Sequence, residues 1–254
     1  MGHASTSGRT RLSDQQLARQ AKNDLAGFLS DAIIPDSFTY RRLNIKMNIA
    51  TSHHLNPYAI QLCTIGRWIA QKNWLPATSG HLSIRAAEHS CLVTGHKDNA
   101  EFSPQDLRTV SWADGDLRCS SGSAADAALH VALYQLFPQC KAVLHSHSLS
   151  STVFSRVIRA DGYPISGYEM QKGLAGCEHA DQAVQLVILD NAPQVPELAA
   201  QLRQRAGELR SAVLVRGHGL YVWGDTPEQA KRQLESWEFL ISCELERLKI
   251  AGGV

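Results

Sequence analysis

The sequence predicts an α/β fold in which short strands are interleaved with helices. Apolar runs bounded by turn residues recur along the chain, as is typical of buried strands. Residues 57–74 and 226–248 instead repeat apolar side chains at three- or four-residue steps, the period of an amphipathic helix. The 254 residues are 44% hydrophobic and 19% charged, enough to bury the core of one domain. Periodicity alone does not decide between parallel and antiparallel pairing.

The first 46 residues differ from the rest of the chain. They begin with small and polar residues and continue with a short amphipathic pattern that carries Leu17, Leu25 and Leu29. We expect residues 1–46 to be a dispensable N-terminal extension, either poorly ordered or due to an incorrectly assigned start. Residues 47–254 are then expected to form one compact domain. The alternative is that the three leucines dock a genuine helix on the domain or on a neighbouring subunit.

The remaining elements follow in chain order. After the helix at 57–74 come short strands, interrupted by a helix at 123–137 that Pro138 ends. The expected strands are residues 81–87, 90–95, 107–115, 141–148, 184–190, 211–219 and 219–224. The last helix has a capping threonine at Thr226, a proline at its first position and a glutamine that closes a capping box.

The composition excludes several classes of protein. With 25 Lys and Arg against 24 Asp and Glu, the formal net charge of +1 argues against a nucleic-acid-binding surface. No apolar run approaches the roughly 20 residues that span a bilayer, and the N-terminus lacks the apolar region of a secretory signal. The six cysteines are scattered without a CxxC pair, as expected of reduced thiols. We therefore expect a cytoplasmic protein.

Two histidines stand at the end of the expected strand K-A-V-L-H-S-H-S. Side chains alternate between the faces of a strand, so His145 and His147 are expected to project together. Two imidazoles on one face suit the capture of one divalent metal ion. The alternative is a pair of surface histidines without a ligand.

A third histidine follows another apolar strand, S-A-V-L-V. It stands in R-G-H-G, where glycines let the backbone turn sharply and present His218 into a cavity. The alternative is a turn histidine that only bonds its neighbours. Three histidines from two strand ends predict a facial ligand set with open coordination positions, which distinguishes a catalytic zinc from a structural one.

The segment G-Y-E-M-Q-K-G, residues 167–173, places Glu169 between hydrophobic neighbours. Partial burial would fit this carboxylate for acid–base work. The alternative is an exposed glutamate paired with Lys172.

These motifs, in this order, resemble those of the class II aldolases. The shared pieces are S-G-H-L-S-I-R, a T-G-x-K turn, A-A-D-x-x-L-H, V-L-H-S-H-S, Y-E-M-Q-K-G and R-G-H-G-L-Y-V-W-G, spread from about Tyr58 to Leu248. The last two resemble the methylthioribulose-1-phosphate dehydratases of methionine salvage in particular. The resemblance implies a class II aldolase-like fold with a central, mainly antiparallel sheet flanked by helices, and usually a homotetramer.

The resemblance also implies a set of site residues. Zinc (Zn2+) is expected on His145, His147 and His218, and the catalytic acid/base is expected at Glu169. Sugar-phosphate aldolases lack the E-M-x-K-G setting and place a working glutamate where this chain has Asp126. The implied residues for the sugar-phosphate substrate are Ser79, Gly80, His81, Thr94, Gly95, Lys97, Asp126 and Lys172. Here the chain departs from the family, with a histidine in place of the asparagine of S-G-N-L-S, and T-G-H-K-D in place of S-G-x-H-K-G.

The implied reaction is the zinc-dependent dehydration of 5-methylthioribulose 1-phosphate to 2,3-diketo-5-methylthiopentyl 1-phosphate. Zinc would stabilise the charge that develops when the C3 proton leaves, and Glu169 would protonate the departing C4 hydroxyl. The base for the C3 proton stays open between Glu169 and a zinc-bound hydroxide. One alternative is a zinc aldolase or epimerase for another sugar phosphate, against which Y-E-M-Q-K-G argues. The other is a non-catalytic aldolase-like binding module, against which the three histidines argue.

Overall fold

The computed structural model describes residues 56–95, 103–113, 116–121 and 127–252. The expectations for residues 1–46, for Lys97 and for Asp126 lie outside the described residues. The α/β fold class is confirmed for the described residues.

The strands of the described residues form one open sheet of nine strands, in the order β4-β3-β2-β1-β5-β9-β8-β7-β6. The strands are β1 (Leu82–Ala87), β2 (Ser90–Val93), β3 (Arg108–Ala113), β4 (Asp116–Cys119), β5 (Ala142–Ser146), β6 (Gly162–Ile165), β7 (Val184–Leu189), β8 (Ala212–Val215) and β9 (Gly219–Gly224). Every neighbouring pair is antiparallel except β7 and β8, which are parallel. The expected mainly antiparallel sheet is therefore confirmed.

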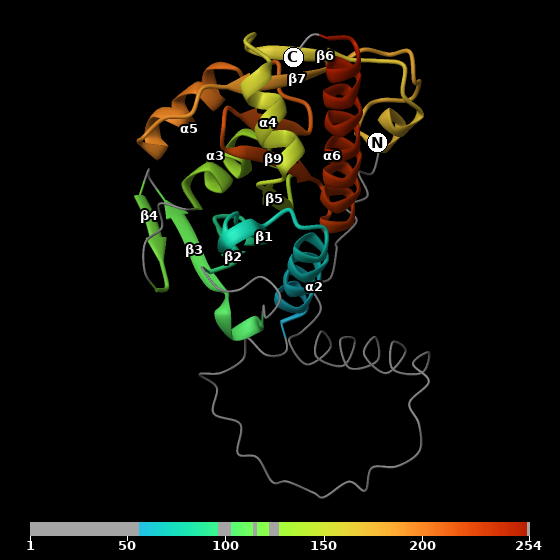
Figure 1. The fold of residues 1–254 in the computed structure, drawn as a ribbon. Coiled ribbons are helices and arrows are strands. Elements are labelled where there is room, and N and C mark those ends of the chain that lie inside the picture. Colours follow the sequence, from blue (N-terminus) through green and yellow to red (C-terminus); the bar gives the residue numbers. More distant parts are fainter. Residues whose placement is uncertain (1–55, 96–102, 114–115, 122–126, 253–254) are drawn as a thin grey trace, which may run out of the picture. The chain divides into compact units, whose positions relative to one another are not determined.

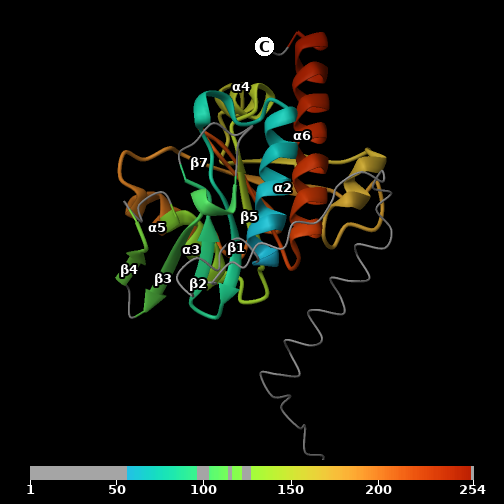
Figure 2. The same cartoon turned by 90° about the horizontal axis from the view of Figure 1, so that it is seen from below.

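Helices cover both faces of the sheet (Figure 1). The helices are α2 (Pro57–Gln71), α3 (Ala128–Leu136), α4 (Leu149–Val157), α5 (Val195–Gln204) and α6 (Pro227–Ile250), with short 3-10 turns η2 (Pro76–Thr78), η4 (Pro104–Asp106) and η6 (Glu169–Gly173). The helices α2, α4 and α6 share one apolar core with the sheet, and α3 and α5 share the other. Figure 2 shows α2 and α6 side by side. No helix of the described ranges is long and apolar enough to cross a membrane.

Alternation along β5 sorts its side chains between the two cores. Ala142 and Leu144 pack in the core under α2 and α6, whereas Val143 packs in the core under α3 and α5. This explains why the strand reads as a continuous apolar run, since both of its faces are covered. By the same alternation, the side chain of His145 lies on the same face of the sheet as Val143, and that of Ser146 lies on the same face as Leu144.

The start of α6 follows the capping signal of the sequence with one difference. The Thr226 hydroxyl accepts a hydrogen bond from the Gln229 backbone N–H at 3.1 Å, as expected of a capping residue. The Gln229 side chain, however, accepts from the backbone N–H of Asp225 at 2.6 Å. It therefore reaches one residue further back than in a capping box.

Candidate metal centre

The end of β5 brings two imidazoles onto one side of the strand. His145 is 2% exposed, and its ring centroid lies 4.5 Å from that of His147. The His145 backbone N–H donates to the carbonyl of His81 at 3.1 Å, and that of His147 donates to the carbonyl of Trp74 at 2.8 Å. The strand end is thus held by backbone bonds on both sides of Ser146, and the expected common face of the two histidines is confirmed.

The third imidazole comes from the turn between β8 and β9. Gly217 has φ +66°, a left-handed conformation that glycine adopts without strain, and the His218 N–H closes the turn on the Val215 carbonyl at 3.0 Å. The next residue, Gly219, lies so close to β5 that a Cβ atom there would stand 2.1 Å from the Ser146 carbonyl oxygen. The two glycines therefore set the turn and the close approach that bring His218 to His145.

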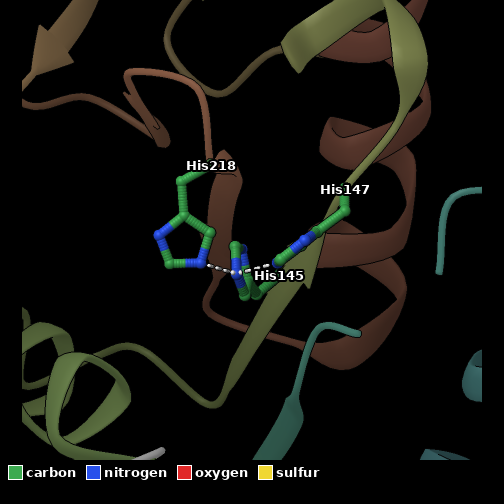
Figure 3. Close-up of side chains that lie close together, drawn as sticks. All are labelled: His145, His147 and His218. Carbon is green, nitrogen blue, oxygen red and sulfur yellow. Dashed lines mark hydrogen bonds between the residues drawn. The ribbon is translucent and has the colours of Figure 1, made fainter. Parts of the chain in front are cut away.

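The three Nε2 atoms converge, as Figure 3 shows with His145 between its two neighbours. The Nε2 of His145 lies 2.7 Å from that of His147 and 3.3 Å from that of His218. One nitrogen of each ring lies within 4.8 Å of the others, and among the described residues no other group of His, Cys, Asp or Glu shares this property. The expected metal ligands are therefore brought together by the fold.

The surroundings keep these imidazoles uncharged. Burial, followed by the neighbouring His147 and His218, holds the pKa of His145 well below its ordinary value. Burial and His218 lower the pKa of His147 to about 4, and burial lowers the pKa of His218. At neutral pH the rings are therefore free of the protons that would compete with a metal ion.

The geometry fits a metal ion held by three nitrogens. The Leu220 carbonyl can only accept, so at 3.1 Å it takes the hydrogen of His145 Nδ1 and leaves the Nε2 lone pair facing the cluster. Two imidazole nitrogens 2.7 Å apart need a proton or a cation between them, because facing lone pairs repel. Tetrahedral zinc with bonds of about 2.0–2.1 Å separates its ligand nitrogens by about 3.3 Å, which the His145–His218 separation matches. The His145 and His147 nitrogens, 2.7 Å apart, would move apart by about 0.6 Å to hold the ion.

Part of the expected substrate loop lies against the metal centre. Gly80 has φ +87°, and a Cβ atom there would stand 2.6 Å from the His145 carbonyl oxygen. Its neighbour His81 bonds the His145 N–H and lies near enough to lower the pKa of His147. Ser79 instead turns its hydroxyl back onto the Pro76 carbonyl. The loop is therefore placed beside the histidines by glycine packing.

The other expected substrate residues lie in structural contacts. The buried Thr94 hydroxyl accepts from the Leu82 N–H at 3.0 Å, which ties β2 to β1. Gly95 follows at the end of β2, where a Cβ atom would stand 3.1 Å from the Asp106 carbonyl oxygen. Lys172 forms an ion pair with Glu169 at 2.7 Å.

Of the two alternatives that the sequence left open for Glu169, the exposed one holds within a single chain. Its side chain is 77% exposed on η6, and it takes the alternative that the sequence allowed, an ion pair with Lys172. The 3-10 turn buries Gln171 instead and leaves Met170 40% exposed. Hydrophobic neighbours in the sequence therefore did not desolvate this carboxylate.

Helix α6 stands between η6 and the imidazoles. A Cβ atom at Gly173, the last residue of η6, would meet the Ser236 hydroxyl at 2.2 Å, whereas Ser146 bonds Glu238. Two residues of a helix lie about 200° apart around its axis, so the two contacts use opposite sides of α6. Within one chain, Glu169 is not brought to the metal centre.

Two residues of the site were missed by sequence reasoning. The ring of Tyr221 stacks on His145 with centroids 3.7 Å apart and planes 8° apart. Glu238 is buried behind the strand end and accepts hydrogen bonds from three serines. The strand register places Tyr221 opposite His145, but only the fold shows which strands are neighbours.

The family is decided by comparison with known proteins. Residues 60–245 match the model of the class II aldolase and adducin N-terminal domain. The chain belongs to the class II aldolase and adducin family. Among its curated relatives, the methylthioribulose-1-phosphate dehydratase of Serratia proteamaculans is 44% identical over 184 residues, which cover 71% of this chain and 90% of the relative. That of Yersinia enterocolitica is 42% identical over 183 residues, 71% of this chain and 87% of the relative.

Solved structures of lower identity share the class II aldolase fold. The L-fuculose-1-phosphate aldolase of Thermus thermophilus is 20% identical with a TM-score of 0.61, covering 77% of this chain and 96% of that one. YgbL of Escherichia coli is 22% identical with a TM-score of 0.61, covering 73% and 86%. At these identities the similarity shows the fold alone.

Proposed function

We propose that this family member is a zinc-dependent dehydratase. It removes water from 5-methylthioribulose 1-phosphate and releases 2,3-diketo-5-methylthiopentyl 1-phosphate in methionine salvage. The assignment of the substrate rests on the 44% identity of this chain to most of a relative that is named for this reaction. The converging imidazoles provide the site that such a reaction needs. All six cysteines are free thiols, which suits a reducing cytoplasm.

The zinc would be held by the Nε2 atoms of His145, His147 and His218. Imidazole is a ligand that suits zinc, and three protein ligands leave a coordination position open for a substrate oxygen. When bound, zinc supplies Lewis-acid stabilisation of negative charge on that oxygen, worth several kcal/mol. The phosphate is assigned to the loop at residues 79–81, because Gly80 lies against His145.

Glu169 is assigned the proton transfers. The C3 hydrogen is acidic because it neighbours the C2 carbonyl, and the C4 hydroxyl leaves as water only once it is protonated. A carboxylate that takes the C3 proton becomes the acid that the C4 hydroxyl needs, so one group serves both steps. A positioned acid–base group contributes about 100- to 10,000-fold in rate.

The position of Glu169 implies that it acts on substrate bound at the histidines of a second copy of the chain. In its own chain Glu169 is exposed and separated from the imidazoles by α6. Large apolar side chains are exposed on η6 and along α6, as expected of a surface that another copy covers. They are Met170, Phe239 and Ile250, at 40%, 48% and 87% exposure. The homotetramer implied by the family resemblance would supply such a copy.

Co-expression of two inactive variants tests this arrangement. His147→Ala lacks a metal ligand, and Glu169→Gln lacks the acid–base group, so each alone is inactive. In mixed assemblies some sites combine intact histidines from one chain with an intact glutamate from another. Random assembly restores on the order of a quarter of the normal activity. Absence of recovery in purified mixed assemblies would show that Glu169 does not act between chains.

The reaction itself is tested by product analysis. Zinc-loaded protein is incubated with 5-methylthioribulose 1-phosphate, and the products are followed by NMR. A dehydratase gives the diketone phosphate with all carbon–carbon bonds intact and the C3–H and C4–O bonds broken. An aldolase would instead cleave the C3–C4 bond and release a three-carbon keto phosphate, and an epimerase would give a stereoisomer. A binding module would give no product and would hold no zinc.

A further inference from the structure

A carboxylate is buried behind the metal centre, on the opposite side of β5 from the histidines. Glu238 of α6 is 2% exposed. It accepts hydrogen bonds from the hydroxyls of Ser146 at 2.6 Å, Ser148 at 2.5 Å and Ser151 at 2.7 Å. Burial raises the pKa of Glu238, and the three hydroxyls oppose that rise. The group is thus held entirely by serines.

The serines alternate with the metal ligands. In H-S-H-S, His145 and His147 face the metal centre. The hydroxyls of Ser146 and Ser148, the serine that follows each histidine, reach α6 on the other side. Ser148 also begins α4, because its hydroxyl accepts from the Ser151 backbone N–H at 3.0 Å. One carboxylate therefore fixes both the end of β5 and the start of the next helix.

A buried carboxylate is an energetically unfavourable way to hold α6 against β5. Burying one without a paired cation costs several kcal/mol, and hydroxyl donors offset only part of that cost. Among the described residues, its ionisation is shifted by burial and by the three serine hydroxyls, and no lysine or arginine contributes. An apolar contact between α6 and β5 would hold the fold at lower cost. A cation held on the other side of β5 would provide the missing attraction, since charges interact strongly through a protein interior.

We propose that Glu238 is a positioning residue for the metal ion. Through Ser146 and Ser148 it fixes the strand end so that His145 and His147 present their nitrogens on the same side of β5 before the metal binds. Its charge also favours a cation over an empty site. The inference rests on the proposed metal site, and it adds a residue that touches neither the metal nor the substrate.

The chain offers a matched control on the same helix. Glu244 is also a buried carboxylate of α6, and it accepts from Tyr163 and Tyr168 at 2.7 Å each and pairs with Arg247. It lies six residues along the helix, and its partners Tyr163, Tyr168 and Arg247 are outside the H-S-H-S segment. Glu238→Gln and Glu244→Gln each keep the size of the side chain and remove its charge.

The test is a competition titration of zinc against a chromophoric chelator, with the visible absorption of bound Co2+ as a second measure. Melting of the zinc-free proteins reports folding separately. Groups that orient metal ligands typically contribute 10- to 100-fold in metal affinity, so Glu238→Gln is expected to bind zinc about 10- to 100-fold more weakly and to change the Co2+ spectrum. Glu244→Gln is expected to keep wild-type affinity and spectrum even where it melts earlier.

A second pair of variants keeps the test decisive if Glu238→Gln fails to fold. Ser146→Ala removes the hydroxyl between the two ligands, whereas Ser151→Ala removes one that reaches the same carboxylate from α4. Ser146→Ala is expected to weaken zinc binding more. Equal effects of the serine variants, equal effects of the two glutamate variants, or unchanged affinity in Glu238→Gln would overturn the inference. A wild-type protein that binds neither zinc nor Co2+ would instead refute the proposed function.

Discussion

The close approach of Gly219 to β5 predicts that Gly219→Ala cannot assemble the metal centre. A Cβ atom at this position would stand 2.1 Å from the Ser146 carbonyl oxygen, 3.0 Å from a ring carbon of His145 and 3.1 Å from one of His147. The nearest of these atoms belongs to the backbone, so no side chain can rotate away. Moving it from 2.1 Å to the 3.0 Å below which Cβ contacts essentially never occur requires a displacement of about 0.9 Å.

This displacement acts on the ligands of both strands. It separates the turn carrying His218 from the strand carrying His145 and His147, whereas metal–ligand distances tolerate only about 0.2 Å. We expect loss of stoichiometric zinc. Overpacking of this kind costs about 1–3 kcal/mol, which for a domain of this size lowers the melting temperature by about 2–12 °C.

The assay compares Gly219→Ala with Gly207→Ala, whose added Cβ meets nothing within 4 Å. Zinc is measured by elemental analysis after dialysis, and melting is followed by circular dichroism on zinc-free samples. Gly207→Ala is expected to match the wild type in both. A Gly219→Ala protein with full zinc and an unchanged melting temperature would refute the reasoning from close packing.

The remaining predictions concern the ligands, the acid, the pH response and the N-terminus. His145→Ala and His147→Ala should each lose zinc and activity and stay folded, because each removes one ligand nitrogen; full zinc in both would exclude the site. Glu169→Gln should keep zinc while kcat falls by orders of magnitude and more than KM rises, since only transition-state help is lost; a near-normal kcat would exclude the residue. Burial lowers the pKa of His130 to about 3 from 6.5, so the unfolded chain binds more protons between these values. Zinc-free protein should therefore lose stability as pH falls from 6.5 towards 3, and His130→Asn should flatten the slope in chemical unfolding; an unchanged slope would contradict the assignment. A protein beginning at Met47 should match the full chain in melting temperature, zinc and activity, and a loss of assembly would show the extension to be structural.

The sequence predicted that His145 and His147 lie together because the geometry of that pair is local. A period of two along a strand places His145 and His147 together whatever the rest of the fold does, and Gly217 marks the turn that carries His218. The long helix α6 was equally visible through its capping residues and its apolar period.

Several shorter elements could not be predicted so readily. Helix α4 is rich in serine and in β-branched residues, which have modest helix propensity, so its contacts with α6 decide its structure. Strand β6 has four residues, including Pro164, and lies at the edge of the sheet. Helix α5 did carry a signal, a proline in its first turn followed by Leu198 and Leu202 at helical spacing.

The burial of Glu238 was not accessible from the sequence, and the sequence did not decide between burial and exposure of Glu169. A glutamate within an amphipathic helix normally indicates a solvated face, and only the packing of α6 on β5 shows that Glu238 is buried. Conversely, the hydrophobic neighbours of Glu169 suggested burial that the η6 turn does not provide. Both cases depend on contacts between segments distant in the chain.

The most direct test of the proposed zinc-dependent dehydration is a zinc titration of metal-free protein, followed by its turnover of 5-methylthioribulose 1-phosphate. We expect no diketone phosphate without zinc, then a linear rise in activity and a break at one zinc per chain. One ion is the number that the single imidazole cluster of the described residues can hold. The same titration of His147→Ala should give no rise. Full turnover by the metal-free protein, or no diketone phosphate at any zinc level, would show that the protein is not a zinc-dependent dehydratase.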